Sequence, residues 1–151
     1  MRQADIAVYD PDGQLQLVVE IKNRPGASAE WATRLRHNLL VHSFIPRAPY
    51  FLLALPDFFY FWTDAISASN LAKPDYKINA TEILAPYLNQ LTQPLNGLSK
   101  YGFEMIMTSW LAGIVHTDLQ PDKVDPNLHW LFDSGLYEAI ARGSVAIEAT
   151  V

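Results

Sequence analysis

Apolar and polar residues alternate through residues 4–22, which predicts two β-strands joined by a tight turn. The first strand spans residues 4–10 (ADIAVYD) and the second spans residues 14–22 (QLQLVVEIK). Asp12-Gly13 stands between them, and this dipeptide between alternating runs is a strong hairpin signal. A two-residue turn at Asp12-Gly13 pairs positions whose numbers add up to 25, whereas a three-residue loop shifts the pairing by one.

The alternation also sorts the hairpin residues onto two faces. One face is apolar and is typical of a core: Ile6, Val8, Leu17, Val19 and Ile21. The other face carries Asp5, Ala7, Val18, Glu20 and Lys22. In this register Asp5 lies opposite Glu20, and two like charges directly opposite each other repel. A divalent metal ion between them is the natural counter-charge, because hard cations take carboxylate oxygens.

The next segment predicts a helix followed by a pair of strands. Ser28 is a suitable N-cap for a helix from Ala29 to about Phe44. The expected inward stripe of that helix is Trp31, Leu35, Leu39 and His42, widened by Leu40 and Phe44 and flanked by Arg34 and Arg36. The continuous apolar run Tyr50–Leu55 predicts a strand buried on both faces beside the second hairpin strand, and Phe58–Trp62 predicts a returning strand.

The second half is expected to be mainly helical. Residues 64–80 are polar and predict an irregular excursion, and the loop expected after the next helix is Gln93–Gly97. The predicted helices are Ala80–Leu91 with a kink or break at Pro86, Ser99–Ile114, and Asn127–Ala141 with an interruption at Asp133-Ser134-Gly135. Ser144–Val151 is compatible with a last strand or with a disordered tail.

Composition narrows the class of protein. The chain has 151 residues, half of them apolar, which is enough for one domain with a substantial core. It has no cysteine, so disulfides and thiolate zinc sites are excluded. No segment approaches an uninterrupted transmembrane length and the chain does not open on a secretory signal, so we expect a cytoplasmic protein with no membrane partner.

Asp5, followed after fourteen residues by Glu20-Ile21-Lys22, resembles the signature of the PD-(D/E)xK, or restriction-endonuclease-like, nuclease superfamily. In that family the acid lies on one strand of a hairpin and the E-x-K lies on the next. The resemblance covers residues 1–62. It implies a single α/β domain over residues 1–151, with a core of mixed sheet, N-terminal hairpin, crossover helix and second strand pair, followed by a mainly helical extension over residues 63–151.

The resemblance implies phosphodiester hydrolysis that depends on Mg²⁺ or Mn²⁺. Asp5 and Glu20 are expected to hold the ion, with the backbone carbonyl of Ile21 completing the protein ligands. Lys22 is expected to orient the nucleophile and to stabilise the pentavalent phosphorus. Pro11-Asp12 also precedes the E-x-K, but Asp12 lies in the turn, eight residues or roughly 26 Å from Glu20, too far to share an ion.

The distribution of charge favours nucleic acid as a partner although the net charge is −5. Residues 22–47 carry five bases against the single acid Glu30, a net charge of +4. Residues 48–151 carry five bases against eleven acids, a net charge of −6. Phosphate binding needs a local field rather than a basic protein. We therefore expect Arg24, Arg34 and Arg36 to contact the phosphate backbone, with DNA favoured over RNA.

Two alternatives to a nuclease function are compatible with the sequence. The chain could be a catalytically inactive nucleic-acid-binding module that keeps the nuclease fold. It could also be a scaffold whose apolar Phe103–Ile114 stripe binds a protein partner, if that stripe is exposed. The family usually has a helix before the first strand, which we expect to be missing here, and a homodimer that covers the uncovered core is compatible with that.

Overall fold

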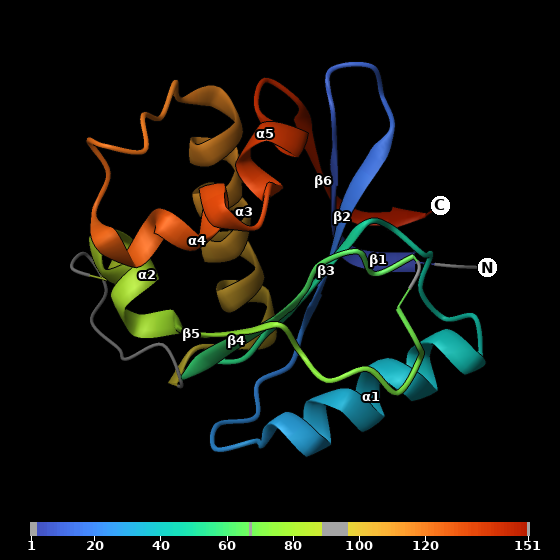
Figure 1. The fold of residues 1–151 in the computed structure, drawn as a ribbon. Helices are drawn as coiled ribbons and strands as arrows, with labels where there is room; N and C mark the ends of the chain where they lie inside the picture. Colours follow the sequence, from blue (N-terminus) through green and yellow to red (C-terminus); the bar gives the residue numbers. More distant parts are fainter. Residues whose placement is uncertain (1–2, 67, 89–96, 151) are drawn as a thin grey trace.

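A computed structural model of the chain describes residues 3–66, 68–88 and 97–150. This part of the chain forms an α/β fold with a mixed six-stranded sheet in the order β5-β4-β3-β2-β1-β6 (Figure 1). β2 and β3 run parallel, and the other neighbouring strands run antiparallel. The strands are β1 (Gln3–Tyr9), β2 (Leu15–Ile21), β3 (Tyr50–Ala54), β4 (Phe58–Trp62), β5 (Tyr76–Asn79) and β6 (Ser144–Thr150).

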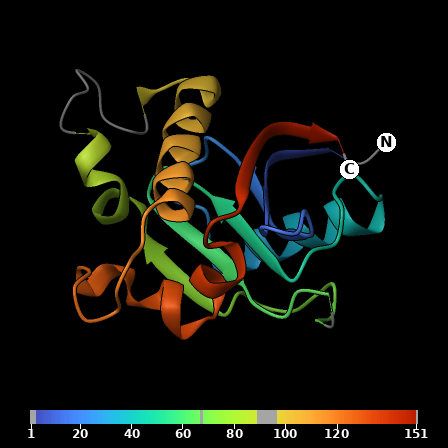
Figure 2. The same ribbon diagram turned by 90° about the horizontal axis from the view of Figure 1, so that it is seen from above.

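Helices cover both faces of the sheet. They are α1 (Ala29–Val41), α2 (Ala80–Leu88), α3 (Lys100–His116), α4 (His129–Asp133) and α5 (Leu136–Ile140), with a short 3₁₀ helix at Pro126–Leu128. α1 covers one face, and α2 to α5 lie on the other (Figures 1 and 2). Within the described ranges, none of these helices combines the length and the apolar character that crossing a membrane requires.

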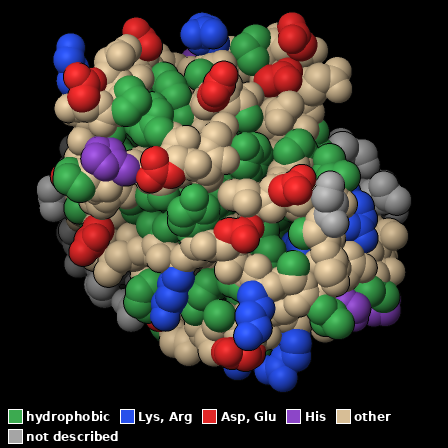
Figure 3. Space-filling model, in the orientation of Figure 1, with side chains coloured by type: hydrophobic (Ala, Val, Ile, Leu, Met, Phe, Trp, Pro, Cys, Tyr) green, Lys and Arg blue, Asp and Glu red, His purple; other side chains and the backbone are tan. Residues whose placement is uncertain are grey.

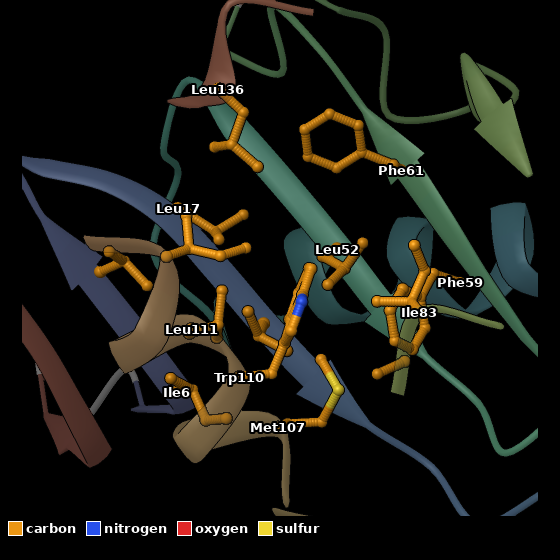
Figure 4. Packing of buried hydrophobic residues seen from close by; sticks show 14 of the residues in the cluster. Ile6, Leu17, Leu52, Phe59, Phe61, Ile83, Met107, Trp110, Leu111 and Leu136 are labelled. Atoms are coloured by element: carbon orange, nitrogen blue, oxygen red, sulfur yellow. The ribbon is translucent and has the colours of Figure 1, made fainter. Parts of the chain in front are cut away.

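The larger core lies between the sheet and α3. Its members come from both layers and include Ile6, Leu17, Leu52, Phe59, Phe61, Ile83, Met107, Trp110, Leu111 and Leu136 (Figure 4). The α3 stripe is buried here: Phe103, Met107 and Leu111 are 0 % exposed, and Trp110 and Ile114 are 5 % exposed. The protein's own core therefore occupies the stripe, which removes the observation on which the scaffold alternative depended.

The hairpin has the register and faces predicted around the acids. Ile6 pairs with Val19, and Val8 pairs with Leu17. The predicted apolar face is buried in the α3-side core, while Val18 is buried on the α1 side. Burial on both faces explains why the paired segments 6–8 and 17–19 are entirely apolar.

The tip of the hairpin differs from the two-residue turn that Asp12-Gly13 suggested. Tyr9 pairs with Leu15, and the Gly13 N–H donates to the Asp10 oxygen at 3.0 Å across a three-residue loop. Gly13 has φ +82°, which a residue without a Cβ adopts at little cost. The loop shifts the pairing by one, and a bulge at Gln16 shifts it back before the acids are reached.

α1 begins where the sequence predicted, but its buried face agrees only in part with the predicted stripe. The Ser28 hydroxyl caps it by accepting the Trp31 N–H at 3.1 Å. The buried residues of α1 are Ala32, Thr33 and Arg36, whereas the expected stripe is only half-buried along Trp31, Leu35 and Leu39. The predicted face is therefore partly confirmed: Trp31, Leu35, Leu39 and Leu40 pack against the core on this side of the sheet, whereas His42 and Phe44 are exposed.

The crossover through α1 places β3 where the sequence predicted it. β3 lies parallel to β2, and Glu20 pairs with Leu53 in this register. β4 then returns antiparallel beside β3, as expected. The end of β2 and the starts of α1 and α3 lie at the same lower side of the molecule in Figure 1.

The second half contributes strands as well as helices. β5 falls inside the predicted irregular excursion, and Ser144–Thr150 is a strand that pairs with β1 (Figure 2). The extension over residues 63–151, predicted to be mainly helical, therefore also contributes two strands to the sheet. α3 extends two residues further than predicted, and the break between α4 and α5 lies at Ser134-Gly135. Residues 89–91, the predicted end of the second helix, and most of the predicted loop 93–97 lie outside the described residues.

Candidate active site

Asp5 and Glu20 meet where the hairpin ladder ends. Main-chain pairing starts at Ile6 with Val19, and continuing that register places positions 5 and 20 opposite each other. Beyond the last paired residues, the Asp5 side chain replaces the missing backbone partner: its Oδ2 accepts the Ile21 N–H at 2.8 Å. This hydrogen bond fixes the carboxylate of Asp5 directly against the E-x-K segment.

Glu20 is a buried acid beside another acid. Its side chain is only 6 % exposed, on the α1 side of the sheet. The pKa of Glu20 is raised to about 8. The main cause is burial, followed by the negative charge of Asp5 and a hydrogen bond between the two carboxyl groups. The Lys22 ammonium opposes this shift without cancelling it. Glu20 therefore tends to keep its proton at neutral pH, unless a cation of higher charge takes the place of that proton.

Lys22 and the Ile21 carbonyl complete the predicted constellation. The Lys22 N–H donates to the Ala54 oxygen at 3.1 Å, so the β2–β3 ladder continues one residue past β2. The Lys22 side chain is half-buried and close enough to Glu20 for its charge to lower that pKa. In an antiparallel ladder the N–H and C=O of one residue point to the same side. The Ile21 carbonyl is thus directed toward Asp5, as its N–H is.

Lys100, which the sequence did not indicate, also contacts the acid pair. It is the first residue of α3, and its Nζ lies 3.3 Å from Asp5 Oδ1. The lysine side chain is 49 % exposed and the aspartate side chain is 17 % exposed. Because Asp5 and Lys100 are 95 positions apart in the sequence, no local pattern connects them. Only the long-range packing of α3 on the sheet brings them together.

The loop between β2 and α1 is tied to three other parts of the chain. The Asn23 side chain donates to the Leu98 oxygen at 2.9 Å, just before α3. The Gly26 N–H donates to Asp57 Oδ2 at 2.7 Å, and the Tyr60 hydroxyl donates to the Ala27 oxygen at 2.8 Å. These bonds hold the residues that follow Lys22 on a fixed path beside the acids.

The three arginines expected to bind phosphate lie in different environments. Arg34 is exposed, and so is Arg24, whose guanidinium carbon lies 4.8 Å from the centre of the Trp31 ring. In Figure 3, Lys and Arg side chains lie both at the lower side and at the upper edge of the molecule, and acidic side chains are scattered over the whole face.

Arg36 is a correction to the sequence prediction. It is 2 % exposed and donates to the Ala65 oxygen at 3.2 Å and to the Ser69 oxygen at 3.1 Å. Its guanidinium also lies 5.4 Å from the centre of the Trp62 ring. Burial lowers the pKa of Arg36, and the nearby Arg47 adds to this effect. Arg36 therefore anchors the 64–75 segment to α1 and is not available to a nucleic acid in this structure.

The donor set at the hairpin fits a hard divalent ion that keeps several waters. Two carboxyl groups converge with a backbone carbonyl directed toward them, and oxygen ligands of this kind suit Mg²⁺ or Mn²⁺. Among the described residues, no group of three or more His, Cys, Asp or Glu side chains is arranged to hold a metal ion. The protein would thus supply two side chains and one carbonyl.

Comparison with known proteins adds no assignment. No protein-family model matches the chain, no curated protein matches its sequence, and no solved structure matches its fold.

Proposed function

We propose that this protein is a metal-dependent nuclease of the PD-(D/E)xK type that hydrolyses phosphodiester bonds of nucleic acid, with DNA favoured. The observation that carries the proposal is the acid pair. Asp5 and Glu20 lie in contact, Lys22 follows on the same strand, and the pKa of Glu20 is raised to about 8. A buried acid whose pKa is perturbed by burial and by a neighbouring like charge is typical of a functional site.

The topology supports the same proposal. The acid and the E-x-K lie on adjacent antiparallel strands, and the crossover helix leads to a strand parallel to the E-x-K strand. This is the arrangement that the resemblance to restriction-endonuclease-like proteins implies for the core. The roles follow from position: Asp5, Glu20 and the Ile21 carbonyl hold the ion, and Lys22 contacts the attacking water or the charge that develops on phosphorus.

Each group has a defined part in the chemistry. When bound, the Mg²⁺ or Mn²⁺ ion supplies Lewis-acid activation of the phosphoryl group and lowers the pKa of a water. The buried carboxylates hold that charge in a site of low dielectric, where the Lys22 ammonium is more effective than in water. Exposed Arg24 and Arg34 contact the phosphate backbone, and Arg36 has no part in this.

The test is cleavage of linear, circular and single-stranded DNA and of RNA by the full chain with Mg²⁺, Mn²⁺ or EDTA. The Lys22→Ala variant should lose at least about a hundredfold in rate, by analogy with removal of one transition-state donor. It should keep the far-UV circular dichroism of the wild type. The matched control is Lys123→Ala, an exposed lysine in the loop after α3, which should cleave at the wild-type rate.

A catalytically inactive nucleic-acid-binding module is the second candidate. The observation in its favour is that Asp5 is already engaged by the Ile21 N–H and by Lys100. A folded protein that binds DNA but does not cleave it with any of the metal ions would support this candidate. Binding that weakens in the Arg34→Ala variant, with a smaller dependence on salt concentration, would assign the surface.

A further inference from the structure

The two oxygens of Asp5 have different partners. Oδ2 accepts the backbone N–H of Ile21, whereas Oδ1 faces the ammonium of Lys100 at 3.3 Å. The first contact is made within the hairpin. The second comes from α3 and is half-exposed, so it can change without unfolding the sheet.

The start of α3 is held in place beside the hairpin. The Ser99 hydroxyl caps the helix by accepting the Gly102 N–H at 3.0 Å. The Leu98 oxygen accepts the side-chain N–H of Asn23, the residue that follows Lys22. Lys100 is therefore directed at Asp5 by a capped helix start that is tied to the E-x-K strand, unlike a lysine on a free surface.

The Lys100 ammonium lies where it would repel a metal ion bound to Asp5. A divalent ion bound to Asp5 Oδ1 would lie roughly 2.1 Å from that oxygen. An ammonium that contacts the same oxygen at 3.3 Å would then lie within about 5 Å of the ion, where like charges repel.

We propose that Lys100 is a positioning residue for Asp5, and that it regulates the site by competing with the divalent ion for Asp5 Oδ1. In the metal-free protein its ammonium balances the negative charge of the acid pair. When the ion binds, the Lys100 side chain moves away from Asp5 into the solvent that already surrounds half of it. This inference rests on the proposed function, because it concerns the same metal site.

The test is titration of the full chain with Mn²⁺, with free Mn²⁺ followed by electron paramagnetic resonance. Two neutral variants, Lys100→Met and Lys100→Gln, should bind Mn²⁺ about twofold to fivefold more tightly, the range expected for removal of one half-exposed charge. Lys100→Arg keeps the charge and should bind as the wild type does. Lys123→Met is the control, since Lys123 is an exposed lysine in the loop that follows the far end of α3, a 17-residue helix about 25 Å long.

The outcomes separate the inference from the proposed function. Unchanged Mn²⁺ affinity in both neutral variants would show that Lys100 only stabilises the fold, and would overturn the inference while leaving the nuclease proposal intact. The same holds if both neutral variants bind Mn²⁺ more weakly. A wild-type protein that neither binds Mn²⁺ nor cleaves any nucleic acid would overturn both. Two neutral variants are used so that poor folding of one still leaves a decisive measurement.

Discussion

The Glu20→Gln substitution removes the charge that Glu20 can carry while it keeps the shape of the side chain. Burial first, and then the neighbouring Asp5 carboxylate, raise the pKa of Glu20 in the folded protein from 4.5 to about 8. In the unfolded chain Glu20 ionises near its ordinary value. Folding therefore increases the number of bound protons at every pH between these two values.

The sign of the pH dependence follows from this difference. Because the folded state binds the extra proton, the free energy of unfolding falls as the pH rises from 4.5 toward about 8. The stabilisation that neutral Glu20 contributes to the folded state is fully present below pH 4.5 and is lost above about pH 8. The difference between 4.5 and about 8 corresponds to roughly 5 kcal/mol at about 1.4 kcal/mol per pH unit. That is a large part of the stability of about 5–15 kcal/mol that is usual for a domain.

The assay is urea unfolding from about pH 5 to about pH 9, without metal, for the wild type, Glu20→Gln and the control Glu82→Gln. Glu82 is an exposed residue of α2, so its variant should follow the wild-type curve. Glu20→Gln should resemble the wild type near pH 5 and become more stable by several kcal/mol above pH 8. Addition of Mg²⁺ at the high pH should stabilise the wild type but not Glu20→Gln. Parallel curves for the wild type and Glu20→Gln would refute the reasoning.

Two further predictions concern stability. Arg36→Met should lower the free energy of unfolding by about 2–4 kcal/mol, because the buried Ala65 carbonyl and the partly buried Ser69 carbonyl lose their donor. Arg34→Met should change it by less than about 0.5 kcal/mol, and urea unfolding measures both. Gly143→Ala should cost more than about 2 kcal/mol, because its Cβ collides with the backbone oxygen of Tyr9. In Gly102→Ala the added Cβ makes only ordinary contacts in the first turn of α3, so this variant should be as stable as the wild type or more stable by up to about 1 kcal/mol. Thermal unfolding compares Gly143→Ala with Gly102→Ala. A Gly143→Ala variant that melts at the same temperature as the wild type would contradict the close approach of Gly143 to the backbone of Tyr9.

The parts of the fold that the sequence predicted depend on local patterns. The hairpin faces follow from period-two alternation, and the start of α1 follows from the Ser28 cap. The break between α4 and α5 follows from Ser134-Gly135, where Gly135 adopts φ +84°. The acid pair belongs to the same group, because the register of one hairpin is enough to place Asp5 opposite Glu20.

The parts that could not be predicted depend on distant partners. The alternation alone does not show that a three-residue loop and the bulge at Gln16 cancel each other. Arg36 and its exposed neighbour Arg34 are equivalent in the sequence, and only the carbonyls of the 64–75 segment distinguish them. β5 is four residues long and is stabilised by its pairing with β4. The contact of Lys100 with Asp5 joins helix α3 to β1 and has no local signal.

The strand that carries Asp5 lies between β2 and β6, and β6 is synthesised last among the described elements. Six residues of β1 pair with β6 in an antiparallel register that runs from the pair Gln3–Thr150 to the pair Tyr9–Ser144. Throughout translation, therefore, β1 has one open edge in the nascent chain, and open edges pair readily with other strands. The strand that positions the acid pair reaches its final surroundings only when residues 144–150 have left the ribosome, so the assembly of the site is delayed until all the other described strands and helices have been synthesised.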